Sequence, residues 1–230
     1  MTEREKILGR IHEALQNKTP ESGAHGAAVA TPGAAAGGTP PSFRDWLPLA
    51  GQTVAEQFEL FAKNCADLKA NFQLLAGRDE LKAALLKLRD AEKWQRIASH
   101  NGELSNFASR SLGLPTVTTD QGYDVQALEQ CDAGITECEV LIAQTGGLVV
   151  TSRGTGGRAL SVLPPHHVVV ARRDQLVADL PAAFAFLQQK YAPDFPSMIS
   201  FITGPSRTGD IERILVMGAH GPKKLTIFCC

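Results

Sequence analysis

Short loops at expected strand ends hold the residues whose types and spacing could do chemistry. In the turn 144–147, the residues Thr145, Gly146 and Gly147 are small enough to let a ligand or another backbone come close. The segment 153–158 follows and combines three glycines with two arginines, which suits an anion such as a phosphate or carboxylate. Neither segment has the spacing of a Walker loop or of Gly-x-Gly-x-x-Gly. The structural alternative is a plain hairpin turn.

Histidines in two further loops could bind a metal or transfer a proton. His166 and His167 are adjacent, and adjacent side chains of an extended segment point to opposite faces, so at most one readily reaches a given site. His166 is the better candidate because His167 begins an apolar run. His220 is held in a turn by neighbouring glycine and proline residues. The alternative for each is a structural histidine.

The loop 204–208 is expected to leave a strand and enter a helix that begins near Asp210. It contains four candidate ligand-binding residues: Gly204, Ser206, Arg207 and Thr208. Backbone N–H groups at a helix start, beside these side chains, would form a cradle for an anion. The alternative is that a hydroxyl group only caps the helix, with Arg207 paired to Asp210 or Glu212. Since this loop and the glycine-rich turn both sit at strand ends, we expect Gly146 and Arg207 to face one pocket.

The elements that must position these loops alternate between helix and strand. A capping-box pattern, Thr53 with Glu56, precedes an apolar helical face and predicts a helix. The stripe Leu81, Leu85 and Leu88 predicts a second one. Short apolar runs predict strands at 72–75, 140–143, 148–151, 167–171, 198–203 and 225–228. Further helices are expected within 176–187, where Pro181 is a candidate first residue, and over 210–217. The pattern predicts an α/β domain over residues 43–230.

The first 42 residues have a different composition. Apolar residues at helical spacing predict a short amphipathic helix within residues 1–16. Residues 17–42 are rich in Ala, Gly, Pro, Ser and Thr and contain almost no large apolar residue, which predicts a flexible linker. We therefore expect residues 1–42 to form a short helix and a flexible segment ahead of the α/β domain.

The bulk composition excludes several classes of protein. The 23 basic and 24 acidic residues give a net charge of -1 without a long block of one sign, which argues against nucleic-acid binding. No apolar run is long enough to span a bilayer, and the polar start is unlike a signal peptide, so we expect no membrane span and a cytoplasmic protein. The five cysteines are odd in number, scattered and without a Cys-x-x-Cys pair. They predict reduced, structural thiols and no metal site.

The order of five motifs is more informative than any one of them. They are Gly134-Ile135-Thr136, the run 142–147, the run 163–167, the run 203–212, and Gly221-Pro222 before a last strand. This order resembles the lactate-utilization (LUD) domain family over residues 131–228. The helical segment from about residue 43 is similar to the beginning of the family's protein C members. The family usually has an acidic residue where this chain has Gln144, which argues against a role that needs a carboxylate there.

The resemblance implies a fold like that of ribose-5-phosphate isomerases, glucosamine-6-phosphate deaminases and coenzyme A transferases, with a sheet flanked by helices. It also implies a subunit of an L-lactate dehydrogenase complex, which oxidises L-lactate to pyruvate. Iron–sulfur partner subunits would carry the clusters, and this chain would bind a small carboxylate or phosphorylated ligand without a cofactor of its own. The alternatives are a stand-alone enzyme acting on a sugar phosphate or acyl-coenzyme A, and a non-catalytic ligand-sensing or assembly module. The sequence identifies no catalytic residue, because it contains no persuasive pair of nucleophile and base.

Overall fold

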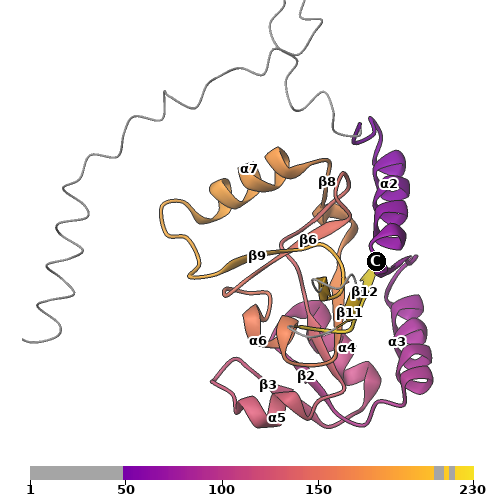
Figure 1. The fold of residues 1–230 in the computed structure, drawn as a ribbon, viewed down its shortest axis with the longest axis vertical. Coiled ribbons are helices and arrows are strands. Elements are labelled where there is room, and N and C mark those ends of the chain that lie inside the picture. Colours follow the sequence, from indigo (N-terminus) through magenta and orange to yellow (C-terminus); the bar gives the residue numbers. More distant parts are fainter. Residues whose placement is uncertain (1–48, 210–214, 218–220) are drawn as a thin grey trace, which may run out of the picture. The chain divides into compact units, whose positions relative to one another are not determined.

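A six-stranded sheet forms the centre of a computed structural model that describes residues 49–209, 215–217 and 221–230 (Figure 1). Across the sheet the strands are β1 (Asn71–Leu74), β12 (Lys224–Cys229), β7 (His166–Ala171), β4 (Ala133–Thr136), β2 (Ile97–Ser99) and β3 (Thr116–Thr118). Every neighbouring pair is parallel. Their carboxyl ends therefore meet along one edge of the sheet, which we call the carboxyl edge, and their amino ends along the opposite amino edge.

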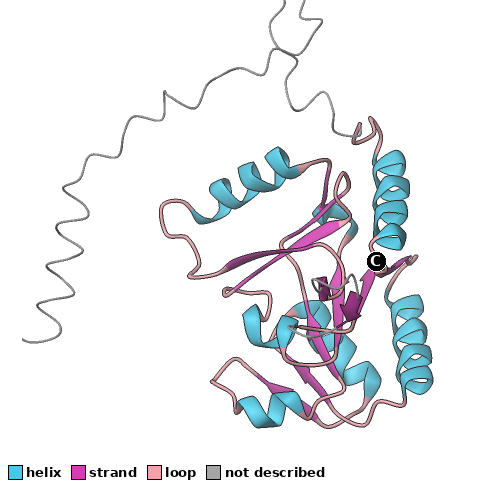
Figure 2. Ribbon diagram, in the orientation of Figure 1, coloured by secondary structure: helices cyan, strands magenta, loops and turns pink. Residues whose placement is uncertain are grey.

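Helices lie between or beside the strands of this sheet and of a smaller one (Figure 2). They are α2 (Val54–Asp67), α3 (Arg78–Glu92), α4 (Glu103–Leu112), α5 (Val125–Glu129), α6 (Gly157–Val162), α7 (Leu180–Tyr191) and the 3-10 turn η2 (Arg173–Gln175). The start of α2 is fixed by a capping box, in which Thr53 accepts from the N–H of Glu56 and Glu56 accepts from the N–H of Thr53. In α7 the side chain of Asp179 accepts from the N–H of Ala182.

A smaller sheet lies beside the first. Its four strands are β8 (Leu176–Val177), β5 (Val140–Ile142), β6 (Gly147–Thr151) and β9 (Ile199–Ile202), in that order. β5 and β6 form an antiparallel hairpin, and β9 adds antiparallel to β6. A separate two-stranded ribbon pairs β10 (Arg207–Gly209) with β11 (Leu215–Met217).

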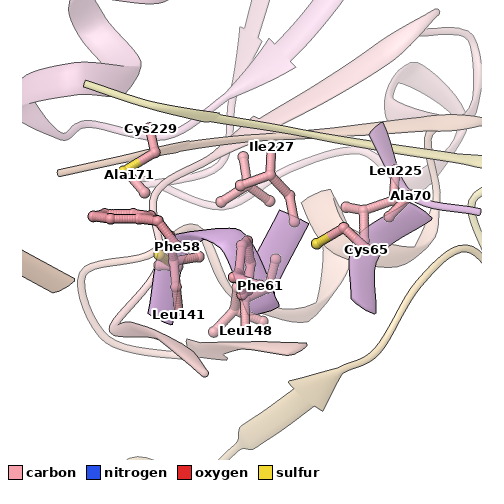
Figure 3. Packing of buried hydrophobic residues seen from close by; sticks show 13 residues of the cluster. Phe58, Phe61, Cys65, Ala70, Leu141, Leu148, Ala171, Leu225, Ile227 and Cys229 are labelled. Carbon is pink, nitrogen blue, oxygen red and sulfur yellow. The ribbon is translucent and has the colours of Figure 1, made fainter. Parts of the chain in front are cut away.

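The core consists of layers because buried strands alternate their side chains between two faces. On one face of the large sheet, Val169 and Ile227 pack against Phe61 of α2 and against Leu141 and Leu148 of the small sheet (Figure 3). On the other face the side chains pack against α3 and α4. The hairpin β5–β6 turns its remaining apolar residues outward, where α7 covers them.

Most of the predicted elements are confirmed, among them the helix after Thr53, the hairpin 140–151 and the strands at 167–171 and 225–228. The predicted helix over 210–217 is wrong at Leu215–Met217, which forms β11. A helix of about two turns is marginal by itself, whereas β10 and β11 satisfy each other's backbone groups. Residues 210–214, His220 and the N-terminal segment 1–42 lie outside the described residues.

The sequence did not predict several short elements, namely β2, α4, β3, α5, β4, α6, β8 and β10. Most of them are too short to show a clear periodicity. No helix in the described part of the chain combines the length and the apolar character needed to cross a membrane.

Candidate functional site

Polar side chains follow three neighbouring strands at the carboxyl edge of the large sheet. His100 comes directly after β2, Glu137 after β4 and Arg172 after β7. Open α/β sheets bind ligands outside the carboxyl ends of their strands. The carboxyl edge is therefore the expected location of a ligand site.

Glu137 is held there by the first turn of α4. Its Oε1 accepts hydrogen bonds from the backbone N–H groups of Leu104 at 2.9 Å and Ser105 at 3.1 Å, and from the hydroxyl of Ser105 at 3.3 Å. Free N–H groups and the helix dipole at a helix start both favour a carboxylate. Gly102 makes room for it, because a Cβ on Gly102 would lie 2.2 Å from this oxygen.

His100 fixes the backbone of the same residue. Its Nε2 accepts the N–H of Glu137 at 3.1 Å, so in the neutral ring the proton sits on Nδ1. Burial lowers the pKa of His100, although the charges of Glu137 and Asp120 act in the opposite direction. Gly156 packs tightly on the ring, since an added Cβ would lie 2.8 Å from Cδ2 of His100. The imidazole is thus held in one place, and its burial favours the neutral form.

Glu139, also buried, belongs to a different network. Its Oε2 accepts from Nζ of Lys190 at 2.6 Å, and its Oε1 accepts from the hydroxyls of Tyr191 at 2.5 Å and Thr151 at 2.8 Å. Burial works against the charged ammonium of Lys190, but the contact with Glu139 outweighs it and raises the lysine pKa. Burial and the bond to Glu139 raise the pKa of Tyr191. Both oxygens of Glu139 are therefore engaged within the protein.

A cleft of about 200 Å³ joins these groups. The charged side chains that line it are Glu137, Glu139, Arg172, Asp174 and Lys190. Its apolar lining comes from Val140, Val177 and Phe186, so the cleft lies between the carboxyl edge, the small sheet and α7. Such a mixture of apolar lining and a few charged groups is typical of small-molecule sites.

None of the seven predicted residues whose side chains the structure describes lines this cleft, while His220 and the side chain of Thr208 lie outside the described part. Thr145 and Gly146 lie in the tight turn of the hairpin and Gly147 begins β6, while Nδ2 of Asn64 in α2 donates to two carbonyl groups of that turn at 2.9 and 3.0 Å. An added Cβ on Gly146, whose φ is +63°, would lie 2.7 Å from Cβ of Asn64. The glycine is thus required by the close approach of α2 and by its left-handed backbone.

The loop 204–208 lies beside that turn. An added Cβ on Gly147 would be 3.0 Å from Cγ2 of Thr203, and one on Gly204 would be 3.0 Å from the carbonyl of Leu68 and 3.5 Å from Nη2 of Arg207. Arg207 is exposed, and its backbone and that of Thr208 lie in β10. The N–H of Ser206 donates to the carbonyl of Pro222 at 2.9 Å.

Turn and loop therefore gather near the amino edge. The end of α2 leads into the start of β1, and Pro222 comes just before β12. The sequence does not show which end of the sheet a loop lies at. In the structure these loops lie away from the carboxyl edge.

His166 makes contacts of another kind. Its Nε2 shares a hydrogen bond with Oγ1 of Thr226 at 2.9 Å, and its ring meets Trp94 edge to face. Among the described residues, its Nδ1 is the one buried side-chain nitrogen or oxygen without a hydrogen-bond partner. Burial is the main reason that the pKa falls to about 4. His166 is therefore neutral at pH 7.

The five cysteines are unpaired, and four of them are buried. Burial raises the pKa of Cys65 and of Cys229 to about 12, so both are thiols rather than reactive thiolates at neutral pH. Within the described ranges, no group of three or more His, Cys, Asp and Glu side chains could hold a metal ion.

The residues that sequence reasoning missed are His100, Glu137, Glu139, Arg172 and Lys190. One signal was present in the sequence, since the motif Gly134-Ile135-Thr136 is followed at once by Glu137. A buried strand that ends on a carboxylate is a candidate site in an α/β sheet. The partners of that carboxylate lie 32 or 33 residues away and could not be foreseen.

Comparison with known proteins gives relatives of one kind. A lactate utilization protein C from Bacillus licheniformis is 37% identical over 103 residues, which are 44% of this chain and 43% of that protein. The protein of that name from Shouchella clausii is 32% identical over 57% of this chain and 58% of its own length. The one from Anoxybacillus flavithermus is 29% identical over 76% of this chain and 81% of its own length. The first two alignments thus cover only about half of each relative.

Among solved structures, the crystal structure of a DUF162 family protein from Deinococcus radiodurans has the same fold, with a TM-score of 0.60 at 23% identity. The match covers 78% of this chain and 99% of that one. The family model of the LUD domain matches residues 58–229, from the middle of α2 to the end of β12. This span contains both sheets and the carboxyl-edge cleft, and the chain belongs to the LUD domain family.

Proposed function

We propose that this chain works in lactate utilization and binds a small carboxylate, L-lactate or pyruvate, in the carboxyl-edge cleft. The observation that carries the proposal is the cleft itself, which combines Arg172 and Lys190 with buried carboxylates and an apolar lining. The names of the curated relatives supply the metabolic context.

The chemistry of the cleft suits such a ligand. The Nε of Arg172 lies 3.3 Å from Asp174, which leaves its two Nη groups to bind a carboxylate, and Lys190, although paired with Glu139, adds a second positive charge. Val140, Val177 and Phe186 offer an apolar surface for a methyl group. Pockets for drug-sized ligands measure roughly 300–1,000 Å³, so a cleft of about 200 Å³ favours a smaller molecule.

We further propose that the chain acts as one subunit of a lactate-oxidising complex. The electron-transfer centres would lie in iron–sulfur partner subunits, as the family resemblance implies. Affinity purification from native cells, with iron analysis of the proteins that co-purify, tests this assignment. Two iron–sulfur subunits are expected. A protein that purifies alone and turns over a sugar phosphate or acyl-coenzyme A would instead indicate a stand-alone enzyme.

The ligand site is tested by titrating pyruvate and L-lactate into the purified chain and its variants by calorimetry. Arg172→Gln removes the two-pronged contact, and we expect about a ten- to hundredfold weaker affinity, because a charge-assisted hydrogen bond contributes about 1.5–3 kcal/mol. Arg78→Gln changes an exposed arginine of another ion pair and serves as the control. Unchanged affinity in Arg172→Gln would contradict the proposed site.

The loops at the amino edge are the second candidate for an anion site. Their residues are Thr145, Gly146, Gly147, Gly204, Ser206, Arg207 and Thr208. Exposed Arg207 is the one most able to bind a carboxylate or phosphate there. Arg207→Lys enters the same titration, where weaker binding in this variant alone would favour the amino edge over the cleft.

A further inference from the structure

Building on the proposed ligand site, we propose that Glu137 is the catalytic proton acceptor of the cleft. It would take the hydroxyl proton of a 2-hydroxy acid bound there. This role goes beyond carboxylate binding, which Arg172 and Lys190 could provide without any chemistry.

The two carboxylate oxygens of Glu137 have different surroundings. All three hydrogen bonds of this carboxylate end on Oε1. Oε2 accepts no hydrogen bond from the part of the chain that the structure describes. The side chain is nevertheless 9% exposed and lines the cleft, and Oε2 is not among the buried atoms that lack a partner. The accessible oxygen of a largely buried carboxylate is thus the one that a ligand in the cleft can reach.

The neighbours of Glu137 hold this oxygen in position. The first turn of α4 fixes Oε1, while His100 fixes the backbone N–H of the same residue. Glu139 lies in the same lining, but both its oxygens are engaged by Lys190, Tyr191 and Thr151. Of the two buried glutamates in this cleft, only Glu137 therefore has an oxygen free to accept a proton.

The proposed step moves one proton to Glu137 and one hydride to an acceptor elsewhere in the complex. The O–H bond at C2 of the bound acid breaks, its proton moves to Oε2 of Glu137, and its electron pair stays on the oxygen. That electron pair then forms the C2=O bond as the C2–H bond breaks. The hydrogen leaves C2 with its two electrons as a hydride for an organic hydride acceptor, a flavin or a nicotinamide, held elsewhere in the complex, and iron–sulfur clusters would then take the electrons from that acceptor one at a time. Arg172 and Lys190, which line the same cleft, can bind the acid's carboxylate and offset the negative charge on the oxygen.

The test measures lactate oxidation by the purified complex that contains Glu137→Gln. The amide oxygen can still accept the three bonds from α4, so fold and ligand binding should persist, but an amide cannot accept the proton. We expect kcat to fall by about 10²–10⁴-fold with little change in KM. Glu103→Gln, an exposed carboxylate in the same turn of α4, should leave kcat unchanged.

The outcomes separate this inference from the proposed function. If the parent complex neither binds nor oxidises lactate, the proposed function fails. If the parent is active and Glu137→Gln keeps its kcat, the function stands and the role of Glu137 is overturned. Should Glu137→Gln fail to fold, Glu137→Ala replaces it with added formate as an external base. Turnover restored by formate supports the proposal, and turnover unaffected by formate contradicts it.

Discussion

Glu137 and Glu139 show how two buried carboxylates of one cleft can have different roles. Glu139 is neutralised by Lys190 and bonded to two hydroxyls, so it serves to join parts of the structure. Glu137 has backbone donors on one oxygen and, among the residues that the structure describes, none on the other. The difference lies in the partners that the fold supplies, since the residue type is the same.

His166 allows a prediction about pH. Its pKa falls from an ordinary value of about 6.5 to about 4 in the folded chain, so the unfolded state binds more protons between these values. This contribution to stability is fully present above pH 6.5 and is lost as the pH falls towards 4. The variant His166→Gln lacks this pH-dependent contribution to stability. The cost of the substitution should therefore be about 2 kcal/mol smaller at pH 5 than at pH 7.

Urea unfolding of the parent and of His166→Gln at both pH values measures this difference. Nearly identical pH dependence in the two proteins would show that the buried imidazole is protonated without penalty, contrary to its contacts with Trp94 and Thr226. His167 remains in both proteins, and burial, the main cause of its own lowered pKa, is common to them; only the smaller effect of the charge on His166 is lost in the variant.

At the scale of elements, the first turn of α4 holds Glu137 in place at the carboxyl edge. Gly102→Ala would place a Cβ 2.2 Å from Oε1 of Glu137 and 2.7 Å from the hydroxyl of Ser105, so the carboxylate must leave its donors. Gly77 is the matched control, because it precedes α3 in the same way and an added Cβ there meets nothing within 4 Å. We expect Gly102→Ala to lower the free energy of unfolding by about 1–3 kcal/mol more than Gly77→Ala.

Denaturant unfolding of both variants gives the comparison. Equal losses would mean that Glu137 moves aside at no cost, and the account of its fixed position would then be wrong.

Elements stabilised by local interactions were predictable from the sequence, and those that depend on distant partners were not. The capping box of α2 and the alternating hairpin β5–β6 are encoded within a few residues of themselves. β11 was predicted as part of a helix because its pairing with β10 leaves no local signal. The glycine-rich turn was found, but its glycine is explained by the approach of α2, which lies some 80 residues earlier in the chain.

At the scale of the whole described region, the small sheet and α7 are joined to the carboxyl edge through Glu139. Tyr191→Phe removes one hydroxyl donor, which lies 2.5 Å from Oε1 of Glu139. We expect a loss of about 1–3 kcal/mol in the free energy of unfolding, because a hydrogen bond to a buried charge is lost. Tyr123→Phe, in which an exposed ring loses its hydroxyl, should change stability by less than about 0.5 kcal/mol.

Thermal or urea unfolding of the two variants provides the test. A Tyr191→Phe protein as stable as the Tyr123→Phe control would show that the hydroxyl of Tyr191 does not help to hold α7 at the carboxyl edge.

The α/β class was predictable from the sequence because the apolar runs of β7 and β12 read as fully buried strands. The location of the site was not predictable, since the sequence does not show which ends of the strands meet at one edge. Glu137, Arg172 and Lys190 come from widely separated segments and share a cleft only in the folded chain.

The central claim is that a small carboxylate binds at the carboxyl edge. A crystal structure of the chain with pyruvate tests it most directly. The expected result is ligand density in the cleft, with the carboxylate of pyruvate on Arg172 and Lys190 and its C2 oxygen accepting a hydrogen bond from the protonated Oε2 of Glu137. Density at the turn 145–147 and the loop 204–208, with an empty cleft, would contradict it.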